Sequence, residues 1–307
     1  MSASAPSTPV IIELPDRGAL KISGADAEDF LQGLVSQDVQ KVTESRSLWS
    51  AFLTPQGKYL HDFFLIRATD GAFLLEGEAD RLPDLLKRLK LYKLRSKVEL
   101  ENLSGTHTVL ALVGQGIPEQ LELSPDVGAT RHDSSSEATV LIDPRHRDMG
   151  ARVLLPSEKA EDFRNRLGLP AGSREDYDRV RIALALPDGR RDLQPDKALL
   201  LENGFDELGG VDWKKGCFIG QELTARTKYR ALLKKRLVTV QSLDGSDLES
   251  GSTVTLNEKN VGEVMSVAGP AGLALMRLNA IEAPEAELSS NGHPVRICVP
   301  DWLVLPA

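Results

Sequence analysis

The chain has 307 residues, of which 41% are hydrophobic, and this is enough for two or three domains with a sizeable core. Its formal net charge of −8 argues against a general nucleic-acid-coating protein. Its two cysteines, Cys217 and Cys298, exclude a disulfide framework and fit a reducing compartment. They are also too few to hold a structural zinc ion or an iron–sulfur cluster by thiolates alone, so no metal site is predicted.

The first residues predict a cytoplasmic protein. They read M-S-A-S-A-P-S-T-P, without a basic or an apolar run, and the first basic residue is Arg17. This composition is typical of neither a secretory signal nor an Arg-rich transit peptide. No apolar run approaches the roughly 18 residues that a membrane-spanning helix needs, so no contact with a membrane is expected.

Residues 1–105 are predicted to form an α+β module. The segments 10–14 and 19–22 are predicted to be strands and are expected to pair as a hairpin across the P-D-R-G turn. Ser23 is expected to cap the amphipathic helix that follows. Strands at 48–53 and 59–66 then flank a T-P-Q-G-K turn, whose composition is typical of a tight connection.

Two basic runs contrast with the acidic composition. Asp80 is expected to cap a helix with leucines on one face, and residues 87–97 within and after it hold six basic residues and no acid. Residues 226–236 also hold six basic residues and no acid. One interpretation is two solvated faces. The other is that both runs flank one anionic ligand, whose carboxylates would pair with the Lys and Arg side chains.

The rest of the chain divides into two parts. Short strands and a helix in residues 106–232 roughly repeat the order of the first module, so a second α+β module is predicted. Residues 233–307 carry evenly spaced short strands with Gly- and Asn-containing turns, which predict a small β-barrel. Cys298 lies in this alternating pattern and is expected to be a core residue.

The segment 214–230, K-K-G-C-F-I-G-Q-E-L-T-A-R-T-K-Y-R, predicts a tight turn that leads into a short helix. Glycines at 216 and 220 allow positive φ angles and a close approach of a ligand to the main chain. Cys217 would lie just before the helix N-terminus and near Lys215, and both features favour a thiolate. A small, buried, unreactive thiol is the other interpretation, and the residues alone leave it open.

This segment carries a resemblance to a known family. The pattern K-G-C-[aromatic]-x-G-Q-E resembles the signature of the YgfZ family of folate-binding proteins, which support iron–sulfur enzymes, including tRNA-modifying ones. The matching residues are Lys215, Gly216, Cys217, Phe218, Gly220, Gln221 and Glu222. Similar family segments are G-x-D-A-x-x-F-L-Q-x-L from Gly24, F-L-T-P-Q-G-K from Phe52, L-Y-x-L-R-x-K-V around Tyr92 and Lys97, and a P-x-E-x-N segment at Glu202 and Asn203.

The resemblance implies a fold like that of the T-protein, the aminomethyltransferase of glycine cleavage. Two α+β modules would surround a central tetrahydrofolate site, with the barrel at the C-terminal end. It implies that Cys217, Lys215 and Asp62 carry any chemistry. It also implies that the folate contacts are Gly216, Phe218, Gly220, Gln221, Glu222, Arg226, Glu202, Lys97 and Tyr92.

The chain departs from the T-protein at two positions. The T-protein has two adjacent aspartates where this chain has His61 and Asp62, so one acidic position is lost. The T-protein also has a glutamate on the folate ring where this chain has Ala183. These differences weaken the case for an aminomethyl transfer reaction.

Three functions therefore remain open. The first is a folate-dependent accessory protein for iron–sulfur enzymes, whose partners are folate and iron–sulfur client or assembly proteins. The second is a tetrahydrofolate-dependent one-carbon (aminomethyl) transferase, and the third is a non-catalytic, folate-gated binding module. Aromatic residues make up only 5% of the chain, so nucleic acid is not expected as a direct ligand.

Overall fold

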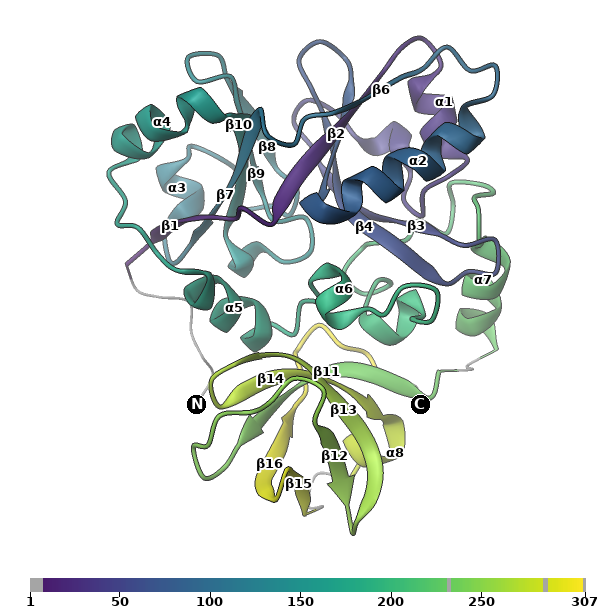
Figure 1. Cartoon of the computed structure of the whole chain (residues 1–307), viewed down its shortest axis with the longest axis vertical. Coiled ribbons are helices and arrows are strands. Elements are labelled where there is room, and N and C mark those ends of the chain that lie inside the picture. Colours follow the sequence, from purple (N-terminus) through teal and green to yellow (C-terminus); the bar gives the residue numbers. More distant parts are fainter. Residues whose placement is uncertain (1–7, 231–232, 284–286, 306–307) are drawn as a thin grey trace.

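The computed structural model describes residues 8–230, 233–283 and 287–305. Two five-stranded antiparallel sheets lie side by side at one end of the molecule, and a closed six-stranded barrel lies at the other (Figure 1). The predicted α+β fold with a C-terminal barrel is confirmed. Within the described ranges, no helix combines the length and apolar character that a membrane crossing requires.

The first sheet has α1 and α2 on its outer face (Figure 1). Its strand order is β3 (Leu48–Leu53), β4 (Tyr59–Arg67), β5 (Phe73–Glu78), β2 (Arg17–Ser23) and β6 (Glu99–Asn102). The helical elements are α1 (Ala27–Gln32), η1 (Val39–Lys41), η2 (Ala79–Arg81) and α2 (Leu82–Lys93). The predicted strand pair around the T-P-Q-G-K turn is confirmed, because β3 and β4 pair antiparallel.

The second sheet has α3 and α4 on its outer face. Its strand order is β1 (Val10–Glu13), β7 (His107–Val113), β10 (Ala151–Pro156), β9 (Ala138–Ile142) and β8 (Thr130–Asp133). The helical elements are α3 (Ile117–Gln120), η3 (Arg147–Met149), η4 (Ser157–Lys159) and α4 (Ala160–Leu167). The predicted hairpin of the first two strands is wrong: β1 pairs with β7, and β2 pairs with β5 and β6.

The second sheet leads into a connecting region and then the barrel. The connecting elements are α5 (Arg174–Ala183), α6 (Gly189–Asp192), η5 (Leu200–Asn203) and α7 (Gln221–Tyr229). The barrel order is β11 (Lys235–Ser242), β14 (Ala271–Arg277), β13 (Lys259–Ala268), β12 (Thr253–Leu256), β15 (Leu288–Ser290) and β16 (His293–Cys298), with α8 (Leu278–Ile281) after β14. The boundaries at 105/106 and 232/233 stay predictions.

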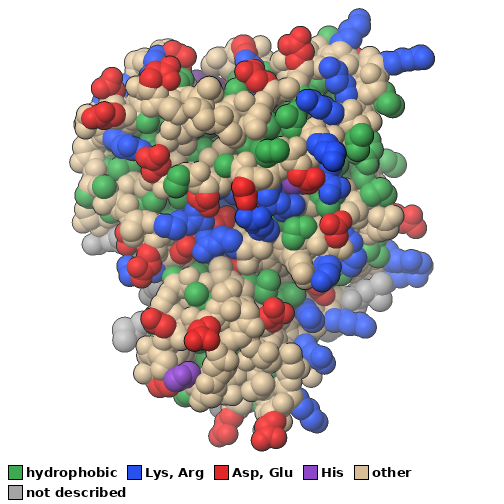
Figure 2. Space-filling view, viewed as in Figure 1, with side chains coloured by type: hydrophobic (Ala, Val, Ile, Leu, Met, Phe, Trp, Pro, Cys, Tyr) green, Lys and Arg blue, Asp and Glu red, His purple; other side chains and the backbone are tan. Residues whose placement is uncertain are grey.

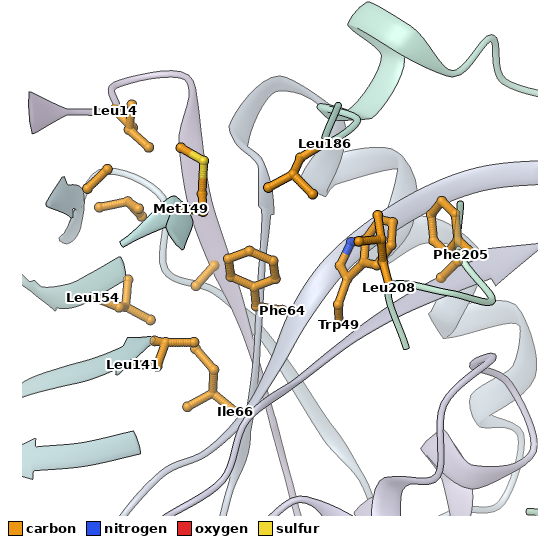
Figure 3. Packing of buried hydrophobic residues seen from close by; sticks show 14 of the residues in the cluster. Leu14, Trp49, Phe64, Ile66, Leu141, Met149, Leu154, Leu186, Phe205 and Leu208 are labelled. Carbon is orange, nitrogen blue, oxygen red and sulfur yellow. The ribbon is translucent and has the colours of Figure 1, made fainter. Parts of the chain in front are cut away.

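The two sheets share one hydrophobic core. Phe64 and Ile66 from the first sheet face Leu141 and Leu154 from the second (Figure 3). Trp49 stacks on Phe205 of the connecting region, with ring centroids 3.8 Å apart. The connecting region therefore closes the same core, and this fixes its position against the first sheet.

Two predicted helix caps are wrong. Ser23 ends β2, and α1 starts after Asp26, whose side chain makes no capping hydrogen bond. Asp80 lies within η2, and α2 starts after Arg81. In both cases the residue has a good capping side chain, but a preceding strand or 3₁₀ turn sets where the helix begins.

A buried arginine joins α5 to the barrel. Arg181 is fully buried and donates to Asp178 (3.0 Å), Asp192 (2.7 Å) and Ser266 of β13 (2.7 Å). Asp192 also accepts a hydrogen bond from the backbone N–H of Ser266 (3.1 Å). A buried guanidinium is stable only when carboxylates and other acceptors surround it, so this network ties the position of the barrel to α5.

Candidate functional site

The signature segment forms a turn that packs against the first sheet. Gly220 has φ +81°, and a Cβ there would lie 2.6 Å from the Thr54 carbonyl oxygen and 2.9 Å from the Gly57 Cα. No larger residue fits between the two segments. The T-P-Q-G-K turn and the signature, which are 160 residues apart in the sequence, therefore touch through their glycines. Gly216 also has a positive φ, +94°, but lies in open space.

Lys215 fixes this turn to the segment that follows α1. Its Nζ donates to the backbone carbonyls of Val35 (2.5 Å) and Gln37 (2.7 Å) and lies 5.3 Å from the centre of the Phe218 ring. Burial lowers the pKa of Lys215 to about 8, while the carboxylates of Asp38 and Asp212 act in the opposite direction. An ammonium group that satisfies two carbonyls fixes the loop backbone and leaves one donor for another partner.

Residues 32–38 complete the support of the signature, and the sequence did not assign them this role. Gln32 donates to the Lys215 carbonyl oxygen (3.4 Å) and to Asp38 (2.9 Å). Gln37 donates to the Gly209 carbonyl oxygen (2.5 Å). Gln32 belongs to the F-L-Q string that resembles the family, and this resemblance was the only signal that could have found it.

The predicted residues of the signature have unlike environments. Cys217 is exposed, whereas Phe218 is 7% exposed and belongs to the shared core. Gln221 donates to the Gly216 carbonyl oxygen (3.1 Å) and so closes the turn. Glu222 and Arg226 are exposed on α7. The turn therefore uses a buried phenylalanine as an anchor and presents the thiol outward.

Asp62 lies on β4 and faces the shared core, away from solvent. It is 7% exposed and accepts hydrogen bonds from Tyr59 (2.7 Å) and Trp49 (3.0 Å). Burial and the charge of Asp62 raise the pKa of the neighbouring Glu78 to about 7. The sequence did not single out Glu78, because its raised pKa depends on residues that only the fold brings near.

His61 points away from Asp62, as alternation along a strand requires. Its Nε2 lies 2.9 Å from Asp84 of α2, and its ring is 4% exposed. Burial, reinforced by the charge of Arg81, lowers the pKa of His61 to about 4. His61 is thus a neutral partner of Asp84 and cannot replace the lost acidic group beside Asp62.

The pKa of His61 predicts a loss of stability in acid. Between pH 6.5 and 4 the unfolded chain binds a proton at His61 and the folded chain does not, so stability falls as the pH falls. The loss attributable to this group is about 3 kcal/mol. We expect urea unfolding at pH 7 and pH 4.5 to show it, and His61→Gln to reduce the difference. An equal pH dependence in both proteins would contradict the assignment.

The remaining predicted residues lie apart from Lys215. Glu202, at η5, is half-buried, and burial raises its pKa against the charges of Lys235 and Lys58. Tyr92 packs edge-on against Phe52, with centroids 6.1 Å apart. The backbone N–H of Lys97 donates to Asp26 (2.7 Å). In the described residues, no hydrogen bond or ion pair connects these three to Lys215, Cys217 or Asp62, and their contact with folate stays a prediction.

The two basic runs follow one side of the molecule. Figure 2 shows Lys and Arg side chains along the right-hand edge of this face, over α2 and α7. In the described part of the chain, Lys228 pairs with Asp206 (2.8 Å) and Arg236 pairs with Glu207. The second run is therefore partly neutralised, whereas Lys87 and Lys90 of α2 are exposed.

A large cavity lies between α5 and the barrel. It has a volume of about 810 Å³, and Ala183, Cys298 and Trp302 are among its lining residues. The Trp302 indole N–H donates to the Leu184 carbonyl oxygen (2.8 Å), so its ring forms a fixed wall. None of the residues predicted to contact folate lines this cavity. Cys298 is half-buried rather than in the closed core, because its strand borders the cavity.

Two family models match parts of the chain. The GCVT N-terminal domain model matches residues 8–122, and the model of the CAF17 C-terminal β-barrel domain matches residues 234–305. Among solved structures, the glycine cleavage system aminomethyltransferase T from Bartonella henselae is similar, with a TM-score of 0.79 over 97% of this chain and 87% of that one. At 15% sequence identity, this similarity establishes the fold alone.

Curated relatives are similar over nearly the whole chain. The mouse protein named "Iron-sulfur cluster assembly factor IBA57, mitochondrial" is 33% identical, over 94% of this chain and 84% of its own length. The human protein of the same name is 34% identical over the same shares. Their mitochondrial names contradict the predicted cytoplasmic location, which rested only on the composition of the first residues. The predicted YgfZ membership is not confirmed: the chain belongs to the IBA57 family.

Proposed function

We propose that this chain is a tetrahydrofolate-binding accessory protein for the assembly of iron–sulfur enzymes, with Lys215 and Cys217 at the folate site. The observation that carries the proposal is similarity over 94% of the chain to proteins named iron–sulfur cluster assembly factors. The exposed thiol on a rigid turn supports it, because a thiol that contacts another protein must be accessible. The match to the GCVT N-terminal domain model supports folate as the ligand.

The geometry gives each residue a distinct part in this proposal. Lys215 keeps one donor after its two bonds to backbone carbonyls, and a folate carbonyl or carboxylate is a suitable acceptor. The Phe218 ring centre lies 5.3 Å from the Lys215 Nζ, and the ring supplies an apolar wall. Cys217 lies between them in sequence and faces outward, towards a client or assembly protein. Folate would thus bind beside the thiol, on the turn that presents it.

A fluorescence titration with tetrahydrofolate tests the folate site. Trp213 is two residues from Lys215, and its indole N–H donates to Asp206 (2.7 Å), so a ligand at the turn is expected to change its emission. We expect saturable binding, weakened about tenfold in Lys215→Ala through the loss of a charged hydrogen bond. Lys214→Ala, an exposed neighbour, is the matched control. Equal affinities in wild type and Lys215→Ala would remove Lys215 from the site.

One observation favours the transferase alternative. Asp62 is buried beside Glu78, whose pKa of about 7 suits proton transfer near neutral pH. Turnover of an aminomethylated donor with tetrahydrofolate, lost in Asp62→Asn, would replace the accessory role with catalysis. His61 argues against it, because its ring lies on the opposite face of the sheet, bonded to Asp84.

A further inference from the structure

The C-terminal end of α2 carries apolar side chains in solvent. Leu91 is 70% exposed and Leu94 is 89% exposed, although α2 already buries Leu82, Leu85 and Leu89 against the first sheet. We call the outer face formed by Lys87, Lys90, Leu91, Lys93, Leu94 and Arg95 the α2-end surface. The surface combines exposed leucines, which favour apolar contacts, with cations, which favour acidic groups.

Leu94 is unfavourable by itself in two ways. It follows the last residue of α2 with φ +42° and ψ −107°, a conformation that glycine adopts far more readily than a branched side chain. Its side chain also gains almost nothing from burial within this chain. A strained and exposed leucine is explained if a contact outside the chain buries it.

A small hollow lies next to Leu91. It has a volume of about 180 Å³, which suits one apolar side chain, and its walls are mainly apolar. The lining residues are Phe52, Leu53, Thr54, Pro55, Gln56, Leu60, Arg88, Leu91 and Tyr92. A pocket beside exposed apolar groups is the arrangement in which one anchoring side chain contributes most of the affinity of a protein interface.

The charge of the α2-end surface selects the partner. In the described ranges, only Arg88 among the six basic residues of positions 87–97 forms an ion pair, with Asp84 (2.7 Å). The other five are Lys87, Lys90, Lys93, Arg95 and Lys97. The whole chain carries a net charge of −8, so this local excess of cations is complementary to an acidic surface on another molecule (Figure 2).

We propose that the α2-end surface docks a partner protein through an acidic segment, one apolar side chain of which enters the hollow beside Leu91. A polyglutamate tail would satisfy the cations but would leave the leucines and the hollow unfilled. Nucleic acid would need stacking platforms, and Tyr92 is the sole aromatic side chain within residues 87–97. A protein segment satisfies the cations, the leucines and the hollow together.

The place of the hollow connects it to the signature. Its wall includes Thr54, and the same turn continues to Gly57, which packs against Gly220. A partner in the hollow would thus contact the turn that supports the Cys217 loop. The docking proposal goes beyond the folate proposal, and Tyr92 is the one lining residue of the hollow that is also a predicted folate contact. Leu91, Leu94, Lys87 and Lys90 are not among the predicted folate contacts, so the docking proposal is tested at residues of its own.

Photo-crosslinking from the α2-end surface tests the proposal. The full-length chain with p-benzoylphenylalanine in place of Leu91 is expressed in cells and irradiated, and crosslinked peptides are sequenced. The control carries the same group in place of Leu243, an apolar residue on the barrel that is 58% exposed. We expect position 91 to crosslink to a net-acidic segment of a protein at an apolar residue, with a higher yield than position 243.

Charge reversal provides the second measurement. Lys87→Glu with Lys90→Glu is expected to lower the yield at position 91 about fivefold, because opposite charges set the rate of encounter. Lys259→Glu with Arg277→Glu makes the same change in net charge on exposed barrel positions, and is expected to leave the yield unchanged. The folate titration is repeated on both double variants, so that a loss of folate binding is recognised separately.

Several outcomes would overturn the docking proposal. Crosslinks to nucleic acid or lipid would assign the surface to those molecules. Competition by a tetrahydrofolate polyglutamate would assign it to the folate tail. Equal yields at positions 91 and 243, or a yield insensitive to reversal of Lys87 and Lys90, would show that the surface has no specific partner.

Discussion

Arg181→Met is expected to lower the free energy of unfolding by about 4 kcal/mol, because it leaves the buried Asp192 carboxylate without its arginine partner. Arg181 is the common partner of Asp178, Asp192 and Ser266, and the last of these belongs to the barrel. The damage should therefore extend to the contact between α5 and β13. Urea unfolding followed by tryptophan fluorescence measures the change in stability, and limited proteolysis detects a loosened barrel.

Arg179→Met is the matched control on the same helix. Arg179 also pairs with two acids, Glu175 (2.5 Å) and Asp176 (3.2 Å), but all three side chains are largely exposed or half-exposed. Exposed pairs contribute about 0–1 kcal/mol, so this variant is expected to unfold almost as the wild type does. Similar losses in both variants would mean that the Arg181 network does not hold the barrel.

Cys217→Ser is expected to abolish the support of iron–sulfur enzymes without changing the fold. Cys217 is exposed and, within the described residues, its side chain makes no hydrogen bond, so the substitution removes no packing and no polar contact. Only the chemistry of the sulfur is lost. The measurement is the activity of iron–sulfur enzymes in cells that lack this chain and carry either the wild type or the variant.

Cys298→Ser separates this role from a general need for thiols. Cys298 lines the cavity beside the barrel, far along the sequence from the signature, and its replacement should support the enzymes as the wild type does. Wild-type activity of the iron–sulfur enzymes with Cys217→Ser would contradict a chemical role of the thiol and favour a folate-gated binding module. Loss of support together with a lowered Tm would instead indicate a structural role.

Local patterns predicted the strands better than their partners. The strand-like segments 48–53 and 59–66, joined by a five-residue turn, left one reasonable pairing, and β3 and β4 adopt it. The first two strands were also close in sequence, yet β1 lies in the other sheet. Nothing local distinguishes the two cases, because the choice depends on which sheet edge offers an unpaired partner.

The candidate site shows the same limit. The glycines of the signature predicted a turn, and both have positive φ angles in the structure. The acceptors of Lys215 are backbone carbonyls of residues 35 and 37, which have no mark in the sequence because every residue has a carbonyl. The environment of His61 depended on Asp84, which reaches it from α2. Residue types predicted which side chains could react or bind, whereas long-range contacts decided the hydrogen-bond partners and the protonation of those side chains.

The position of β1 in the second sheet has a consequence for the order of folding during synthesis. All five strands of the first sheet come from residues 17–102, so that sheet has its full set of strands before β7 leaves the ribosome. The β1 strand is made earlier but must wait about one hundred residues for β7, its only ladder partner in the described chain. During that interval its apolar residues Val10, Ile11 and Ile12 stay unpaired and accessible to chaperones or to wrong partners.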